Sequence, residues 1–298
     1  MARGRVTEIG FTGSALDRAD HLRLDEAQLD ALLRSAEARL LALAELDPVL
    51  DEEGRLTWAA LGPDEEVIFL GLDGSVPLFA PLVTLERIGA RAWSVFRLLA
   101  LMSPRDVAIW GTARSLNEWH ARHGFCGRCG AATASFRAGW GRRCGQCGLE
   151  HFPRVDPVVI MLAEHEGRVF VARQPQYPPG RYSALAGFVE PGESIEEAVA
   201  RELMEEAGLV VSDVRYVASQ PWPFPGSLMI ACLASAESAE IRLDTTELED
   251  GFWIDRAGVE AALAGAPDAP FLAPPPYAIA HSLLVRWLEQ DRDERETK

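Results

Sequence analysis

The segment from Gly187 to Leu209, GFVEPGESIEEAVARELMEEAGL, limits the fold of this 298-residue chain more than any other feature. Ser194 is followed three residues later by Glu197, which is the spacing of a capping box. A helix is therefore predicted to begin just after Ser194. Gly208 is suited to the left-handed conformation that commonly ends a helix. The segment thus predicts one helix that is bounded at both ends.

One face of this helix is predicted to change from apolar to acidic. At 100° per residue, a single inward stripe contains Ile195, Ala198, Val199, Glu202, Glu205 and Glu206. Carboxylates are rarely buried without a cation, and three so close together would raise one another's pKa. Oxygen ligands suit Mg²⁺ or Mn²⁺, which often join protein carboxylates to substrate phosphates. The pattern therefore predicts a divalent metal site, and the alternative is a solvated acidic helix.

The whole segment resembles the Nudix box, G-x5-E-x7-R-E-U-x-E-E-x-G-U with U aliphatic, at every defined position. The resemblance implies an α/β/α sandwich around a mixed sheet. It also implies hydrolysis of a nucleoside diphosphate linked to another moiety. Glu202, Glu205 and Glu206 would then supply metal ligands and the base. Arg201 would hold the glutamates by ion pairing, and Glu193 would support the loop.

A second motif, SQPWPFPGS, follows the box at Ser219–Ser227. Its prolines predict a stiff loop or sheet edge, and Trp222 and Phe224 offer flat faces for a base or ring. The alternative is a proline-rich connector that covers the sheet edge. The motif resembles the SQPWPFPxS signature of the NADH pyrophosphatase branch of the Nudix family. The resemblance implies a substrate-binding role for Ser219, Gln220, Pro221, Trp222, Pro223, Phe224, Pro225, Gly226 and Ser227.

Four cysteines form two CxxCG turns at Cys126, Cys129, Cys144 and Cys147. This spacing predicts a zinc ribbon, in which four thiolates fill a tetrahedral site and make the Zn²⁺ structural. Two disulfides are the alternative, which a reducing compartment would disfavour. Cys232, in an apolar run, is predicted to be a buried core thiol. A zinc ribbon just before the Nudix domain is also the arrangement of the NADH pyrophosphatase branch.

The charge of the chain is uneven. A net charge of −16 argues against a general nucleic-acid binder. Between Ala121 and Arg154, however, six arginines (122, 128, 137, 142, 143 and 154) accompany a single acid, Glu150. This basic segment fits either ion pairing with acidic neighbours or a surface that faces phosphates.

These anchors predict an N-terminal α/β domain at 1–120, a zinc ribbon at 121–153 and a Nudix domain at 154–298. In the first domain, the spacing of Leu29, Leu32, Leu33, Ala36, Leu40 and Leu43 predicts an amphipathic helix. A hairpin is expected around Asp73-Gly74, and helices over Arg91–Leu101 and from Pro104 to about Trp119.

The Nudix domain is predicted to contain a hairpin around Glu166-Gly167. Further strands are expected at Gly187, Val214–Ala218, Met229–Leu233 and Gly251–Ile254. A loop over Ala264–Pro276 and a closing helix from about Tyr277 to Glu289 complete the prediction.

The resemblance implies further site residues. Glu247 would be an extra metal ligand, and the carbonyl of Ala186 would meet the metal or substrate. Phe188 and Phe152 would stack on the nicotinamide. The family frequently has tyrosine at the position of Phe152, and phenylalanine lacks the hydroxyl that a tyrosine would offer for a hydrogen bond. Arg97 and Ala280 are further substrate-binding candidates, placed by ungapped counting.

The function implied is metal-dependent hydrolysis of NAD(H) to AMP and nicotinamide mononucleotide, with NAD-capped RNA as a second substrate. The alternatives are another nucleoside diphosphate derivative such as ADP-ribose, or a non-catalytic Nudix sensor. We expect a cytoplasmic protein, because no secretory segment or membrane span is visible. The family resemblance implies a homodimer.

Overall fold

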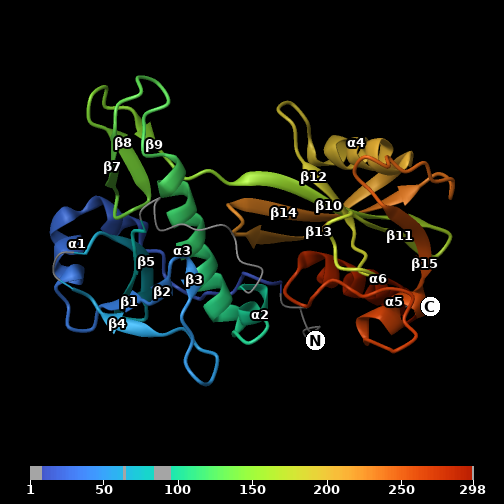
Figure 1. Ribbon diagram of the computed structural model, residues 1–298, viewed down its shortest axis with the longest axis horizontal. Helices are drawn as coiled ribbons and strands as arrows, with labels where there is room; N and C mark the ends of the chain where they lie inside the picture. The colour runs from blue at the N-terminus through green and yellow to red at the C-terminus, as the bar shows by residue number, and fades with distance from the viewer. Residues whose placement is uncertain (1–8, 63–64, 84–94, 297–298) are drawn as a thin grey trace. The chain divides into compact units, whose positions relative to one another are not determined.

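The computed structural model describes residues 9–62, 65–83 and 95–296, which Figure 1 shows in colour. By its internal contacts the chain forms two compact units. Unit 1 comprises Met1–Gly10, Asp156–Gln220 and Leu228–Lys298, and unit 2 comprises Phe11–Val155 and Pro221–Ser227. The second motif is therefore divided between the two units. None of the described helices combines the length and hydropathy needed to cross a lipid bilayer.

Unit 1 is a sheet covered by helices on both faces. Its strands are β10 (Asp156–His165), β11 (Arg168–Arg173), β12 (Leu185–Phe188), β13 (Val211–Trp222), β14 (Ser227–Ala236) and β15 (Asp250–Asp255). The strand order is β13-β14-β10-β11-β15, with β12 paired to β10. In Figure 1, α4 (Ile195–Ala207) lies over one face, and α5 (Arg256–Leu263) and α6 (Ile279–Glu296) lie over the other. The predicted α/β/α sandwich is confirmed.

Alternation along β10 divides the core of unit 1 into two layers. Val159 and Met161 pack in the cluster that contains Leu203 of α4. Ile160 and Leu162 pack in the cluster that contains Leu283 of α6. Neighbouring residues of one strand therefore serve opposite helices, which fixes the register of β10 between the two layers.

The ends of α4 lie where the sequence predicts them. Ser194 accepts from the backbone N–H of Glu197, and the Glu197 side chain accepts from the backbone N–H of Ser194. Gly208 ends the helix at φ 67°, a left-handed conformation that favours glycine. Local chemistry alone accounts for both boundaries.

Unit 2 combines a small sheet, helices and a zinc-ribbon hairpin. Its elements are η1 (Asp20–Leu24), α1 (Glu26–Leu33), β1 (Arg39–Leu41), β2 (Leu43–Ala44), β3 (Asp47–Pro48), β4 (Trp58–Ala60), β5 (Val67–Asp73), β6 (Val76–Pro81), α2 (Val95–Leu99), α3 (Pro104–Arg122), β7 (Thr133–Phe136), β8 (Gly141–Cys144) and β9 (Glu150–His151). The sheet order is β4-β1-β6-β5. The predicted hairpin at Asp73-Gly74 and the helix that opens at Pro104 are confirmed.

The predicted helix that ran through Leu40 and Leu43 is wrong in its second half. The helix ends at Leu33, Leu40 lies in β1 and Leu43 lies in β2. Leu40 pairs with Phe79 of β6, so sheet pairing buries the leucine that the helical spacing had placed on a helix.

Two other predicted helices differ from the structure in their bounds, and one helix of the structure was not predicted. Of the helix expected over Arg91–Leu101, Val95–Leu99 form α2, residues 100–101 form a turn, and residues 91–94 lie outside the described residues. The closing helix α6 begins at Ile279 and continues to Glu296, beyond its predicted end. Helix α5 was not predicted; it spans only Arg256–Leu263, in a segment rich in alanine and glycine.

Buried polar side chains fix α3 within unit 2. The Asn117 side chain is fully buried, accepts from the backbone N–H of Val83 and donates to the carbonyl of Pro81. The Trp110 indole N–H donates to the carbonyl of Leu46. These bonds connect α3 to segments more than thirty residues away, so the helix has a defined rotation.

Candidate active site

The site begins with a close approach between β12 and α4 in unit 1. A Cβ atom at Gly187 would lie 1.9 Å from the carboxyl carbon of Glu202. No side chain other than hydrogen can occupy this position while Glu202 keeps its conformation. The glycine of the box therefore makes room for a carboxylate against the strand.

Arg201 joins the helix, the preceding loop and the strand. Its guanidinium donates to Glu193 at 2.6 and 3.0 Å, to Glu202 at 2.8 Å and to Glu205 at 3.0 Å. It also donates to the carbonyl of Phe188 at 2.9 Å. Glu193 in turn accepts from the backbone N–H of Glu190, so these hydrogen bonds lower the pKa of Glu193. One cation thus holds three carboxylates and the end of β12.

Glu206 is the carboxylate that Arg201 does not reach. Its residue is 5% exposed, and no basic group among the described residues lies within ion-pair distance of it. Burial, and after it the nearby charges of Glu202, Glu247 and Asp244, raise the pKa of Glu206 to about 8. A buried carboxylate surrounded by other carboxylates fits a divalent cation with oxygen ligands.

The structure corrects one part of the predicted acidic stripe. Glu202 and Glu206 face inward and are buried, but the Glu205 side chain is 61% exposed and turns toward Arg201. Glu247 is exposed to solvent, yet it lies close enough for its charge to raise the pKa of Glu206. Among the described residues, only the four cysteines have ligand atoms already within 4.8 Å of one another, so the glutamate cluster is the more open of the two candidate metal sites.

Three other predicted residues of unit 1 lie in different environments. Ala186 and Phe188 flank Gly187 in β12, and the Phe188 ring is largely exposed, as a stacking surface requires. Ala280 lies near the start of α6 and its side chain is buried in the core, so only its backbone could meet a substrate. Their roles remain predictions.

Gln220 serves as an anchor within unit 1. The side chain is fully buried, and its amide nitrogen donates to the carbonyls of Gly10 and Tyr277. Its oxygen accepts from the backbone N–H of Ile279. Both amide hydrogens are therefore engaged by the protein, which favours a structural role over the predicted substrate contact.

The rest of the second motif packs within unit 2. Phe11, Phe96 and Trp110 form what we call the aromatic socket, which holds Trp222 and Phe224. Both motif residues remain partly exposed. The motif forms the end of β13, the turn and the start of β14, and β13 is the edge strand of the sheet order. The predicted position at a sheet edge is therefore confirmed.

Two predicted substrate contacts lie elsewhere in unit 2. Phe152 is 47% exposed, with the Arg137 guanidinium 5.7 Å from its ring centroid. Arg97 is exposed on α2. Arg114, which is not among the predicted site residues, is buried on α3 and contacts the second motif. The spacing of residues along α3 does not indicate that the charged side chain of Arg114 is buried.

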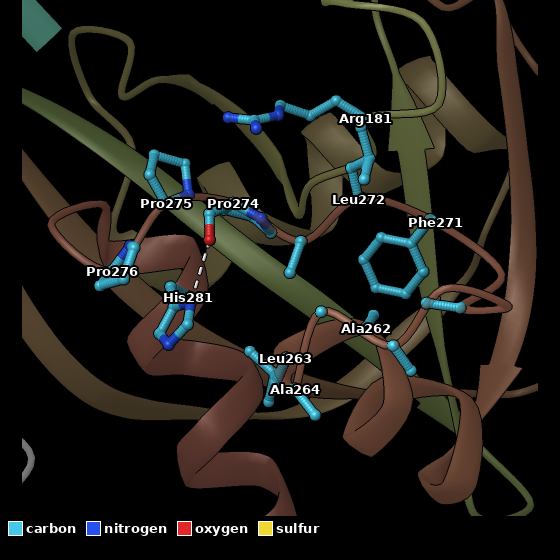
Figure 2. Close-up of a pocket in the computed structure, with 14 residues that line it drawn as sticks. Arg181, Ala262, Leu263, Ala264, Phe271, Leu272, Pro274, Pro275, Pro276 and His281 are labelled. Atoms are coloured by element: carbon cyan, nitrogen blue, oxygen red, sulfur yellow. Dashed lines mark hydrogen bonds between the residues drawn. The ribbon is translucent and has the colours of Figure 1, made fainter. Parts of the chain in front are cut away.

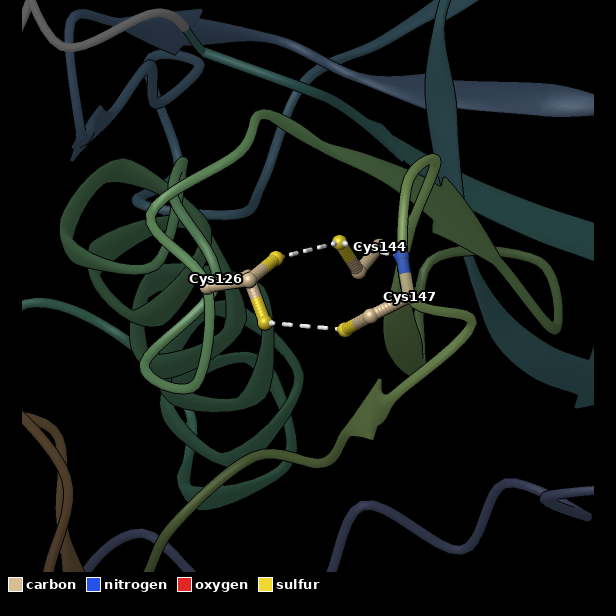
Figure 3. A group of neighbouring side chains, drawn as sticks. Cys126, Cys144 and Cys147 are labelled. Carbon is tan, nitrogen blue, oxygen red and sulfur yellow. Dashed lines mark hydrogen bonds between the residues drawn. The ribbon is translucent and has the colours of Figure 1, made fainter.

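The four cysteines of the zinc ribbon converge. Figure 3 shows Cys126, from the loop before β7, facing Cys144 at the end of β8 and Cys147 in the turn that follows. The Sγ atoms of Cys126 and Cys147 are 3.7 Å apart, and those of Cys129 and Cys144 are 3.5 Å apart. A tetrahedral zinc with ~2.3 Å bonds to sulfur requires about 3.8 Å between sulfurs, whereas a disulfide requires about 2.05 Å. All five cysteines are free, so the disulfide alternative is wrong.

The surroundings of these thiols also fit a metal. Backbone N–H groups of Arg128 and Cys147 point at the sulfurs of Cys126 and Cys144, and they lower the pKa of both thiols. Lowered pKa values favour the thiolates that zinc binds. Cys232 is a buried core thiol, as predicted, and burial raises its pKa to about 11.

Most arginines of the basic segment already have partners. Arg122 pairs with Glu118, Arg137 with Asp20, and Arg143 with Glu150. Arg142 donates to the hydroxyl and carbonyl of Thr133. These contacts favour the ion-pairing interpretation of the segment over a surface that faces phosphates.

A separate hollow of about 430 Å³ lies in unit 1 near the start of α6. Figure 2 shows Arg181, Phe271 and His281 among its lining, with His281 donating to the carbonyl of Pro274. None of the residues predicted for the active site lines it. This hollow is therefore not the space that the carboxylates border.

Both the carboxylate site and the four-cysteine cluster lie in segments that match known protein families. A family model described as the NUDIX domain matches residues 153–273, and one described as the NADH pyrophosphatase zinc ribbon domain matches residues 121–152. The NAD-capped RNA hydrolase NUDT12 of Homo sapiens is 39% identical over 266 residues, which cover 84% of this chain and 54% of that protein. The chain thus spans about half the length of that relative.

Two further relatives are covered more completely. The NAD-capped RNA hydrolase NudC of Mycobacterium bovis (strain BCG / Pasteur 1173P2) is 38% identical over 290 residues, 91% of this chain and 92% of that protein. The mitochondrial NAD(P)H pyrophosphatase NUDT13 of Homo sapiens is 40% identical over 235 residues, 74% of this chain and 67% of that protein. The chain therefore belongs to the Nudix hydrolase family, and it carries that family's NADH pyrophosphatase zinc ribbon.

We predict that Gly187→Ala abolishes the site with little effect on the fold. The new methyl group would overlap the Glu202 carboxylate, which can rotate away because it is the end of a flexible side chain. We expect the free energy of unfolding to change by less than about 1 kcal/mol, and turnover to fall at least roughly 100-fold. Urea denaturation and steady-state kinetics would measure the two effects. Normal turnover would show that Glu202 need not lie against β12.

We predict that the affinity for Mg²⁺ or Mn²⁺ rises with pH up to about 8. Below its raised pKa, Glu206 carries a proton that a cation must displace, whereas above it the carboxylate is already free. Between about pH 6 and 8 the affinity should rise by up to roughly tenfold per unit and then level off. Isothermal titration calorimetry would measure this, with Glu206→Gln as the control whose dependence is flatter. A wild-type affinity that does not change over this range would contradict the assignment.

We predict that Cys144→Ser lowers stability before it lowers activity. The serine removes one thiolate from a buried corner of the cluster and so weakens zinc binding. The melting temperature should fall, while turnover per folded molecule well below that temperature should stay unchanged. Normal melting with immediate loss of turnover would mean that the zinc is not structural.

Proposed function

We propose that this chain is a metal-dependent diphosphatase that hydrolyses NAD(H) to AMP and nicotinamide mononucleotide and removes the NAD cap from RNA 5′ ends. The observation that carries the proposal is the carboxylate cluster beside β12. There Glu202 lies against Gly187, and buried Glu206 has no basic partner among the described residues. The names of the relatives, NAD-capped RNA hydrolase and NAD(P)H pyrophosphatase, support the choice of substrate.

Mg²⁺ or Mn²⁺ suits this donor set, since every candidate ligand is an oxygen. We assign Glu202, Glu205, Glu206, Glu247 and the carbonyl of Ala186 as the ligands. When bound, such ions neutralise charge on the diphosphate and lower the pKa of the attacking water. Zn²⁺ in the cysteine cluster has a structural role only, because four thiolates leave no open position.

The side chains of the site then have separate tasks. Arg201 keeps Glu202 and Glu205 in place, so the carboxylates need little rearrangement when substrate arrives. A carboxylate of the cluster accepts the proton of the attacking water. The exposed ring of Phe188, next to Gly187 in β12, offers a face on which nicotinamide can stack.

We also propose that the protein works as a homodimer in the cytoplasm. The homodimer follows from the family resemblance, and light scattering of the purified chain would test it. Five free cysteines fit a reducing compartment such as the cytoplasm, and cell fractionation would test that location.

A substrate panel with matched variants tests the function. Wild type, Glu206→Gln and Glu196→Gln would be incubated with NADH, NAD⁺, ADP-ribose and NAD-capped RNA, and the products separated. Glu196 is exposed in the first turn of the same helix, so its variant controls for the change of charge. We expect AMP and reduced nicotinamide mononucleotide from NADH, and 5′-monophosphate RNA from the capped RNA.

Glu206→Gln should lower kcat by roughly 1,000-fold on every substrate without changing the melting temperature, whereas Glu196→Gln should behave as wild type. Near-normal turnover in Glu206→Gln at saturating Mg²⁺ would contradict the assignment of Glu206 to the active site. Cleavage of ADP-ribose but not NADH would point to the alternative substrate. Binding without cleavage of any substrate would point to a sensor.

A further inference from the structure

The proline-rich part of the second motif has few backbone N–H donors of its own. Pro221, Pro223 and Pro225 have no N–H to donate. Within the motif, the backbone N–H of Phe224 donates to the carbonyl of Trp222 at 2.9 Å. Pro223 is buried, so its carbonyl needs a donor from elsewhere in the chain.

Arg114 of α3 supplies that donor. Its Nε donates to the carbonyl of Pro223 at 3.1 Å, and its guanidinium carbon lies 4.9 Å from the ring centroid of Phe224. All of these residues belong to unit 2. The same guanidinium therefore holds one backbone group and one aromatic ring of the motif.

The charge of Arg114 is compensated inside the protein. Its side chain is 5% exposed, and its Nη2 donates to Glu118 at 3.1 Å. Its Nη1 lies 3.6 Å from Asp47. Two carboxylates thus orient the guanidinium and help to direct its Nε at the motif.

The aromatic socket holds the rings on their other sides. Phe96 stacks on Trp222 with an interplanar angle of 18° and lies 5.2 Å from Phe224. The ring centroids of Phe11 and Trp222 are 5.5 Å apart, and those of Trp110 and Phe224 are 6.1 Å apart. Ring packing limits how the side chains tilt, whereas the bond from Arg114 fixes the backbone between them.

We propose that Arg114 is a positioning residue for substrate binding, which sets the shape that Trp222, Pro223 and Phe224 present to the dinucleotide. Unit 2 would then have a role in substrate binding, because its helix α3 and the aromatic socket hold a motif that follows α4 in the sequence. The inference rests on the proposed function of the chain as an NAD(H) diphosphatase.

Arg114→Lys tests the proposal, with Arg105→Lys as the matched control. Lysine keeps the charge but loses the planar guanidinium and its Nε donor. Arg105 lies on the same helix, has a side chain that is 42% exposed, and pairs with Asp73 rather than with the motif. Hydrogen exchange of the amides of Trp222, Phe224, Gly226 and Ser227 would be measured without substrate, and kcat and KM would be measured with NADH.

We expect faster exchange across the motif in Arg114→Lys, a KM for NADH raised about tenfold and a kcat changed less than twofold. A merely structural role would not give this split. The KM effects of Arg114→Lys and Phe224→Ala should also fail to add, because both act on one segment. If Arg114→Lys does not fold, Arg114→Gln combined with Glu118→Gln removes the buried ion pair as a unit.

Each other outcome overturns a definite part of the proposal. Unchanged exchange would show that Arg114 does not hold the motif. Faster exchange with unchanged KM, in a wild type that cleaves NADH, would show that the held shape is irrelevant to substrate. A wild type that does not cleave NADH would overturn the proposed function and the substrate role of Arg114, while the exchange data would still decide whether Arg114 holds the motif.

Discussion

The hydrogen bonds of Arg201 connect the loop, the helix and the strand that meet at the carboxylate site in unit 1. One guanidinium contacts Glu193 in the loop, Glu202 and Glu205 on α4, and the carbonyl of Phe188 at the end of β12. These contacts raise the pKa of Arg201, so its charge is permanent. Without that cation three carboxylates would repel one another, and the close approach that Gly187 permits would be unfavourable.

The same network explains why one carboxylate is left without a counter-charge. Arg201 compensates Glu202 and Glu205 but does not reach Glu206, which burial and neighbouring acids leave with a pKa near 8. A negative charge on the buried Glu206 carboxylate is therefore unfavourable, and either a proton or a bound cation compensates it. A site of this kind is prepared for metal binding without being closed in advance.

Local chemistry determined which parts could be predicted from the sequence. The ends of α4 follow from Ser194, Glu197 and Gly208, all within the helix or next to it. Leu40 was misplaced because its burial comes from pairing with β6, a contact that helical spacing does not encode. Likewise, the bond from Arg114 to Pro223 joins residues 109 positions apart. The exposure of Glu205 depends on where Arg201 reaches, which spacing alone cannot give.

Anomalous X-ray scattering from crystals soaked in Mn²⁺ tests the central claim, that the carboxylates beside β12 form a divalent metal site, most directly. Data collected at the manganese edge should show a peak within about 2.5 Å of carboxylate oxygens of both Glu202 and Glu206. A peak at the zinc edge among the four cysteines serves as the internal reference. A strong zinc peak without manganese density at the glutamates, at saturating Mn²⁺, would contradict the account.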